Sequence, residues 1–179
     1  MKKLFFTTLI VLLATACQQK QTRGVVLNEI CGEDADGLEW VEVANGTDQA
    51  VNLRGYKLMK MDGDGVDKVL YKFPDTLLAA GAIFTVNAEF LKAHIPNKKP
   101  AVIELLDAEG NVADAFDSEQ DLELEGHAKG ESYARVPNIT GGWTLCKAAT
   151  WDAPNDGKPA ETAPAVADKD DFDLDEDED

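Results

Sequence analysis

Alternation of apolar and polar residues, rather than a helical period, organises the middle of the chain. Residues 38–45, Leu-Glu-Trp-Val-Glu-Val-Ala-Asn, are rich in aromatic and β-branched types and place charged and apolar residues in turn. Successive side chains of an extended strand point to opposite faces, so this pattern predicts a half-buried β-strand. We expect the rest of the domain to pack on this strand.

Similar short stretches recur between turn residues. Expected strands cover residues 24–31, 38–45, 56–61, 66–73, 82–87, 101–106, 112–116, 132–136 and 143–146. Asp-Gly-Asp-Gly at 62–65 is the strongest hairpin signal. Residues 89–94 predict a helical turn or two, and 117–130 predict a long acidic loop with one ordered turn. Short strands with glycine-rich turns predict an all-β sandwich.

The first seventeen residues have the composition of a signal peptide. Lys2 and Lys3 precede an apolar run at 4–13, small residues at 14–16 and then Cys17. The run is shorter than the roughly 20 residues of a spanning helix. Its end resembles the lipobox of bacterial lipoproteins, which implies that Cys17 is lipidated. The alternative is an ordinary secretory signal with an incidental cysteine. Because no Asp follows Cys17, we expect the outer rather than the inner membrane of the cell envelope.

Composition divides the remaining chain into a polar tether at 18–23, a sandwich domain at 24–156 and an acidic tail at 157–179. Like charges at such density oppose collapse, so we expect the tail to be disordered. Phe172 and Leu174 would allow it to act as a docking peptide, and a solubilising tail is the alternative. The net charge of −17 argues against a nucleic-acid partner, since phosphate binding needs clustered Lys and Arg.

Two cysteines remain for the domain once Cys17 is assigned to lipid. Cys31 follows the first expected strand and Cys146 lies in the last one. An oxidising compartment favours a disulfide between them. A loop of this length would contribute up to about 4 to 5 kcal/mol in the chain-entropy model. Two buried thiols are the alternative.

An ordered series of short motifs resembles the lamin tail domain family. The motifs are Leu-Asn-Glu-Ile at 27–30, Glu-Trp-Val-Glu-Val at 39–43, Val-Asn-Leu-Arg-Gly-Tyr-Lys-Leu at 51–58, Leu-Leu-Ala-Ala-Gly at 77–81, the hairpin at 106–114 and Ser-Tyr-Ala-Arg-Val-Pro at 132–137 with Trp143. Residues 150–155 depart from the Thr-Pro-Gly that usually precedes the closing Asn. The resemblance implies an immunoglobulin-like β-sandwich that acts as a stand-alone binding or adhesion module, and it brings no catalytic residue.

Acid–base chemistry has only one candidate cluster, formed by Asn28, Glu29, Glu39 and Glu42 on two neighbouring strands. We expect Glu29 and Glu39 to face outward, and a glutamate that pairs with Arg54 or Lys57 across a sheet is ordinary structure. No Ser or Cys arrangement accompanies the two histidines. The sequence therefore predicts a protein that is not an enzyme.

Two further groups of residues are candidates for binding. Carboxylates in two loops could hold calcium, with plain turn chemistry as the alternative: Asp34, Asp36, Asp62, Asp64 and Asp67. Trp143 and Trp151 lie near loops and could face a ligand, whereas Trp40 and Tyr56 lie within strands and should pack. No other cofactor is indicated.

The function expected from these features is a non-enzymatic, lipid-anchored envelope protein that acts as a protein-interaction or adhesion module. Its partner would be an envelope protein or a glycan. The alternative is an accessory subunit that binds glycan or substrate in trans with a hydrolase. Exposed tryptophans would favour a glycan, and an exposed apolar patch would favour a protein.

Overall fold

Eleven strands and one short helix make up the part of the chain that the computed structural model describes, residues 23–62 and 66–155. The elements are β1 (Val25–Cys31), β2 (Trp40–Asn45), β3 (Val51–Asn52), β4 (Lys57–Lys60), β5 (Lys68–Lys72), β6 (Leu77–Leu78), β7 (Ile83–Asn87), β8 (Val102–Leu106), β9 (Val112–Asp117), α1 (Ser118–Leu122), β10 (Ser132–Val136) and β11 (Gly142–Cys146). Each long strand lies where alternation predicts one.

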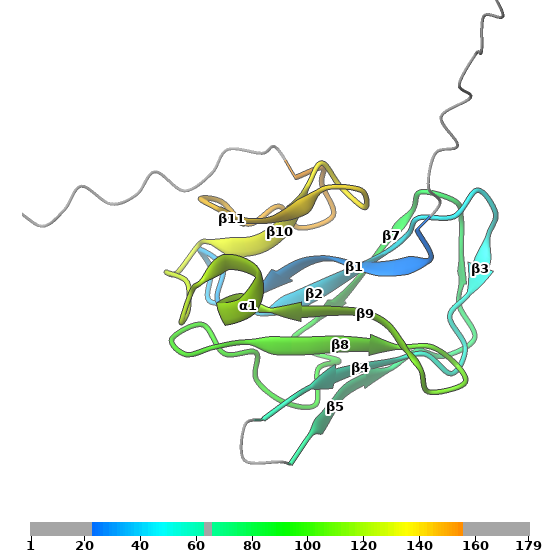
Figure 1. The fold of residues 1–179 in the computed structure, drawn as a ribbon, viewed down its shortest axis with the longest axis horizontal. Coiled ribbons are helices and arrows are strands. Elements are labelled where there is room, and N and C mark those ends of the chain that lie inside the picture. The colour runs from blue at the N-terminus through cyan, green and yellow to red at the C-terminus, as the bar shows by residue number, and fades with distance from the viewer. Residues whose placement is uncertain (1–22, 63–65, 156–179) are drawn as a thin grey trace, which may run out of the picture.

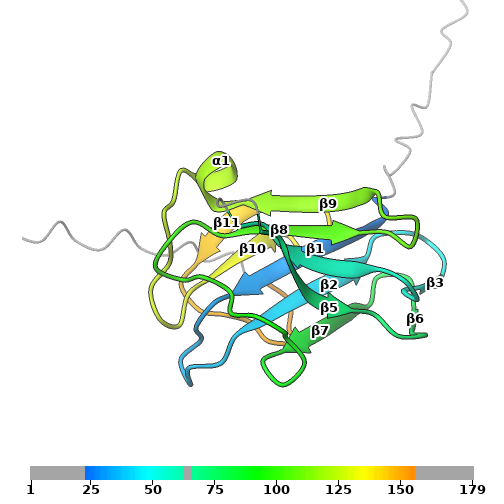
Figure 2. The ribbon, with the colours of Figure 1, turned by 90° about the horizontal axis from the view of Figure 1, so that it is seen from below.

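The strands form two main antiparallel sheets that face each other. One sheet has the order β11-β10-β1-β2-β7, the other has the order β5-β4-β8-β9, and β3 pairs with β6 in a small ribbon. Figure 1 shows the two sheets as two layers, and Figure 2 shows the four-stranded sheet in front of the five-stranded one. This is the expected immunoglobulin-like β-sandwich.

The inner faces of the two sheets supply the hydrophobic core. Val41 and Val43 of β2 belong to the core cluster, as do Leu58 of β4 and Ile103 and Leu105 of β8. All six residues of β2 are buried, however, which means that its outward face is covered as well. The predicted half-buried strand is therefore buried on both sides.

A β-bulge explains an irregularity in the first strand. Val25 and Leu27 keep the period of two, but Ile30 joins the same core after an odd step. The register between β1 and β2 shifts between Leu27 and Glu29. A bulge inserts one extra residue in one strand, so the later side chains change face.

The loops differ from expectation in one place. Residues 88–90 form a single hydrogen-bonded turn rather than a helix. Beyond it, the Lys92 N–H donates to the Leu70 carbonyl at 2.9 Å, which ties this loop to β5. The ordered turn expected within 117–130 is α1, and its N-cap Asp117 accepts hydrogen bonds from the N–H groups of Glu119 and Gln120.

Candidate functional site

Two glutamates lie side by side on the outer face of the five-stranded sheet. Glu29 of β1 and Glu42 of β2 are cross-strand partners, and neither has any exposed surface. Alternation along β2 points Glu42 away from the core, together with Trp40. The prediction of an outward face is confirmed for Glu29, the cross-strand partner of Glu42, but the expected pairing with cations across the sheet is wrong, because another part of the chain covers both carboxylates.

The covering part is the C-terminal segment, which we define as residues 149–155. The Thr150 N–H donates to Glu29 Oε1 at 2.9 Å, and Thr150 Oγ1 lies 2.5 Å from Glu29 Oε2. The Asp152 N–H donates to Glu42 Oε1 at 2.8 Å. The two buried carboxylates therefore anchor the C-terminal segment to the sheet.

Polar side chains of the sheet complete the partners of these carboxylates. The Ser132 hydroxyl donates to Glu29 at 2.6 Å, and the Asn28 amide donates to Glu42 Oε2 at 3.0 Å. Burial raises the pKa of Glu42 to about 7, and the charge of Glu29 adds to this rise, whereas the Asn28 hydrogen bond opposes it. Glu42 consequently exchanges its proton near neutral pH.

A carboxyl group with a pKa near 7 has the proton affinity that general acid–base catalysis uses. Such catalysis also requires a substrate within hydrogen-bonding distance. Here the backbone N–H groups of Thr150 and Asp152 occupy the acceptor positions of Glu29 and Glu42, and neither glutamate has exposed surface. In this arrangement the pair closes the fold and has no access to substrate.

Asn155 ends the C-terminal segment and locks it in place. Its side-chain amide donates to the Arg135 carbonyl at 2.9 Å, and its N–H donates to Asn138 Oδ1 at 2.8 Å. The asparagine that the family resemblance places at the end of the domain thus has a structural role, despite the unusual residues before it.

A buried ion pair joins the two sheets. The guanidinium group of Arg135 on β10 donates to both carboxylate oxygens of Asp114 on β9, at 2.9 and 3.0 Å. The same Arg135 donates to the Leu27 carbonyl, and Asp114 accepts from the Leu27 N–H. Sequence reasoning assigned no role to this pair, although a single arginine beside Tyr133 in an otherwise apolar strand was the available signal.

The two candidate tryptophans have different environments. The ring centroids of Trp143 and Phe116 lie 4.5 Å apart. The Arg135 guanidinium carbon lies 4.5 Å from the centroid of the Trp143 ring. These contacts use part of the half-buried ring in packing, and the prediction that Trp143 faces a ligand stays untested. Trp151 is 38% exposed and contacts Trp40 edge to face, with centroids 5.8 Å apart.

The expected disulfide between Cys31 and Cys146 is not formed, because strand β10 separates them. Cys146 of β11 pairs with Ser132 of β10, and the register of β1 places Cys31 on the other side of β10. Two strand spacings amount to about 9.6 Å, beyond the roughly 7 Å limit between Cα atoms in a disulfide. Both cysteines are buried thiols, and burial raises the pKa of Cys31 to about 12.

The first candidate calcium loop has ordinary turn chemistry at Asp34. Its Oδ1 accepts hydrogen bonds from the N–H groups of Asp36 and Leu38, at 2.9 and 2.8 Å. The Asp36 residue is exposed. A carboxylate that bridges two backbone donors in this way stabilises a loop without an ion.

The second candidate loop is only partly described, because Asp64 lies outside the described residues. Asp62 lies between two ammonium groups, 3.4 Å from Lys60 Nζ and 3.0 Å from Lys68 Nζ, and these lysines lower its pKa. Asp67 is exposed. Across residues 23–62 and 66–155 no three metal-binding side chains converge. Calcium binding stays an untested prediction.

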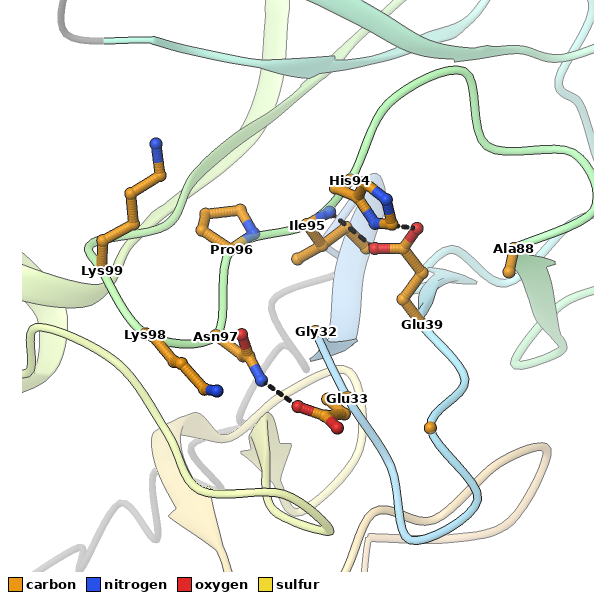
Figure 3. A pocket seen from close by; sticks show the side chains of 11 residues that line it. Gly32, Glu33, Glu39, Ala88, His94, Ile95, Pro96, Asn97, Lys98 and Lys99 are labelled. Carbon is orange, nitrogen blue, oxygen red and sulfur yellow. Dashed lines mark hydrogen bonds and ion pairs between the residues drawn. The ribbon is translucent and has the colours of Figure 1, made fainter.

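A cleft of about 550 Å³ lies between the loop after β1 and the loop at 94–99 (Figure 3). The carboxylate of Glu39 accepts from the Ile95 N–H at 2.8 Å and lies 3.0 Å from Nδ1 of His94. Across the cleft, the Asn97 amide donates to Glu33 at 2.6 Å. Its carboxylates are thus already engaged in holding the two loops together.

A different surface lies where the edges of the two sheets meet. Rings of the two edge strands pack together there, since the ring centroids of Tyr71 on β5 and Phe84 on β7 lie 6.4 Å apart. The ring centroid of Phe90, in the loop after β7, lies 6.5 Å from that of Tyr71. Phe90 is 55% exposed. A groove of about 560 Å³ opens on this surface, which we name the open edge and define by Val69, Tyr71, Lys72, Glu89, Phe90 and Lys92.

Several predicted features lie outside the described residues, namely Cys17, the signal at 1–17, most of the tether and the acidic tail. Within the described part of the chain, no helix is both long and apolar enough to cross a membrane.

Comparison with known families agrees with the fold and with the motif series. The family model described as Lamin Tail Domain matches residues 18–120. No curated protein matches the chain. The match ends before β10, β11 and the C-terminal segment. The motif at 132–137, which resembles a later part of the family, lies on β10 next to β1 of the matched region. The matched residues make up more than half of the chain, which belongs to the lamin tail domain family.

Proposed function

We propose that this protein is a non-enzymatic interaction module, held on the cell envelope, preferentially at the outer membrane, by a lipid on Cys17. Three observations support the proposal. The family supplies a β-sandwich without catalytic residues. The carboxylates best suited to acid–base chemistry are covered by the C-terminal segment. The first seventeen residues have the order of a lipoprotein signal.

The open edge carries the proposal, because it combines exposed aromatic rings with cations. Phe90 is 55% exposed while its ring rests on Tyr71, and Lys72 and Lys92 are exposed beside it. Exposed apolar surface costs free energy in water, so an aromatic cluster with a polar rim is typical of a protein-binding surface. The closed outer face offers no comparable surface.

The test compares two single substitutions in native envelopes. Phe90→Ser changes the open edge. Val112→Ser changes an equally exposed residue on β9, the edge strand opposite β5 in the four-stranded sheet. After crosslinking and affinity capture, the specific partner should be lost with Phe90→Ser and retained with Val112→Ser. Retention of every captured protein by both variants would contradict an interaction role for the open edge.

The anchor has a separate test. Cys17→Ser removes the thiol that would carry the lipid. We expect the protein to move from the detergent phase to the aqueous phase of a detergent partition. Its intact mass should be lower than that of the parent protein by the mass of the acyl groups. An unlipidated mature protein in the parent strain would instead indicate an ordinary secretory signal.

A second candidate function rests on Trp151. Of the two predicted ligand-facing tryptophans, it is the exposed one, and it lines a small cavity of about 100 Å³ with Leu38, Asn87 and Glu89. An aromatic face of this kind could bind a glycan for a hydrolase that acts in trans. Retention on immobilised envelope polysaccharide that is lost with Trp151→Ala and kept with Phe90→Ser would favour this alternative.

A further inference from the structure

We propose that the occupant of the open edge is the acidic tail of this same chain, through its last twelve residues, 168–179, with Phe172 and Leu174 against the aromatic rings. The inference rests on the proposed role of the open edge as an interaction surface. It assigns that surface a partner of defined chemistry.

Charge complementarity is the first argument. The chain has a net charge of −17, yet two exposed lysines, Lys72 and Lys92, line the open edge against one carboxylate, that of Glu89. Seven of the nine residues at 171–179 are Asp or Glu. Within such an acidic protein, a lysine-rimmed surface selects an acidic segment, since like charges disfavour contacts elsewhere.

The spacing of the apolar residues is the second argument. Residues 171–175 read Asp-Phe-Asp-Leu-Asp, so an extended backbone would place Phe172 and Leu174 on one face and the three carboxylates on the other. The open edge offers matching surface. Its groove is lined by apolar Val69, Tyr71 and Phe90 and by charged Lys72, Lys92 and Glu89.

The rings also have room for an apolar partner. Phe73 lies under the cluster and is only 4% exposed, with its centroid 5.0 Å from Tyr71 and 5.6 Å from Phe84. Tyr71 and Phe84 are half-buried, and Phe90 is exposed. The inner ring is therefore packed by the protein itself, whereas the outer rings still have surface that a Phe or Leu side chain would cover.

The length of the chain allows the contact. The C-terminal segment passes close to the open edge, since Trp151 lines the same small cavity as Glu89, the residue before Phe90. Sixteen residues separate Asn155 from Phe172 and span at most roughly 60 Å. A domain of this size is roughly 36 Å across. The tail can therefore reach the open edge of its own domain, and it can equally reach a second copy.

The test is zero-length carbodiimide coupling of the full mature chain, followed by peptide mass spectrometry. Coupling joins a tail carboxylate to a lysine only on contact. Tethering alone would distribute the tail over all exposed lysines, so docking should give Lys72 and Lys92 at least about fivefold more coupling than Lys98 and Lys129. High salt should reduce this preference.

Two variants show whether the apolar residues direct the contact. Phe172→Ser with Leu174→Ser leaves every lysine and carboxylate in place and should reduce the coupling at Lys72 and Lys92 to the level at Lys98. Val166→Ser is the matched control within the tail and should change nothing. Phe90→Ser should act like the double tail variant, because it removes the receiving ring.

The outcomes separate this inference from the proposed function. Even coupling over all lysines in the parent protein would overturn the tail as occupant, and loss of an envelope partner with Phe90→Ser would then leave the proposed function intact. Coupling at Lys72 and Lys92 that survives Phe172→Ser with Leu174→Ser would also overturn it. Mixing isotopically light and heavy chains distinguishes docking on the same copy from docking on a second copy.

Discussion

The closed outer face of the five-stranded sheet and the open edge, where β5 of the four-stranded sheet meets the loop after β7, use opposite chemistry. On the outer face, Glu29 and Glu42 are buried polar groups whose acceptors are filled by Thr150, Asp152 and neighbouring side chains. On the open edge, apolar rings are exposed and cations surround them. Buried polar groups must be paired, whereas exposed apolar groups gain from a partner. In this protein, the buried polar residues of the outer face hold the fold together, whereas the exposed apolar residues of the open edge are available for binding.

The largest effect on stability is expected at the ion pair between Arg135 and Asp114, which joins the two sheets. Arg135→Ala would remove the guanidinium partner of the half-buried Asp114, which keeps only the Leu27 N–H, and the side-chain donor of the Leu27 carbonyl. Removal of one partner of a buried pair costs about 3 to 5 kcal/mol of unfolding free energy. Urea denaturation followed by tryptophan fluorescence measures this. A loss below about 1 kcal/mol, as for an exposed ion pair, would show that the pair does not join the sheets.

The next effect is a pH dependence that originates on the closed face. The pKa of Glu42 is about 7 in the folded protein, against 4.5 as its ordinary value. Between pH 4.5 and 7, Glu42 therefore keeps its proton in the folded state and loses it in the unfolded state. The free energy of unfolding should fall as pH rises through this window, by up to about 3 kcal/mol. Thermal denaturation between pH 4.5 and 8 measures the slope.

The control for this slope is Glu42→Gln, which cannot titrate and should flatten it. Buried His127 has the opposite dependence, because burial lowers its pKa and its Nε2 accepts from the Gly32 N–H, so protonation at low pH destabilises the fold. The difference between the parent and Glu42→Gln curves isolates the glutamate. Identical slopes for the two proteins would contradict a raised pKa at Glu42.

A smaller effect is expected within the C-terminal segment. Thr150→Val keeps the shape of the side chain and removes the hydroxyl next to Glu29. The loss of a hydrogen bond to a buried carboxyl group should cost about 1 to 3 kcal/mol. Hydrogen exchange of the Asp152 N–H should accelerate in this variant, because the C-terminal segment opens more often. Unchanged exchange would mean that the backbone contacts alone hold the segment.

The smallest effect on stability is expected at the open edge. Phe90→Ser removes an exposed ring from the surface, and surface substitutions usually change unfolding free energy by less than about 0.5 kcal/mol. Binding and tail coupling should nevertheless be lost. Calorimetric unfolding of the variant checks the first half of this expectation. A large loss of stability would assign Phe90 to the core and weaken the contrast between the two regions.

Much of the fold follows from local sequence. Period-two alternation places every long strand, and the matched residues 18–120, which contain the motif around Trp40, place the chain in its family. These signals are local because side-chain direction along a strand depends only on backbone geometry. The disulfide was mispredicted because compartment and chain position say nothing about which strand lies between two cysteines.

Local sequence is sufficient for the strands, the family and the outward direction of Glu29. Tertiary structure alone decided that Glu29 and Glu42 are buried, because the segment that covers them lies 121 positions away from Glu29 and carries no pattern that points to it. The open edge is equally non-local, since β5, β7 and the loop of Phe90 each contribute a ring. Burial and exposure depend on what other segments do, and a single strand cannot encode them.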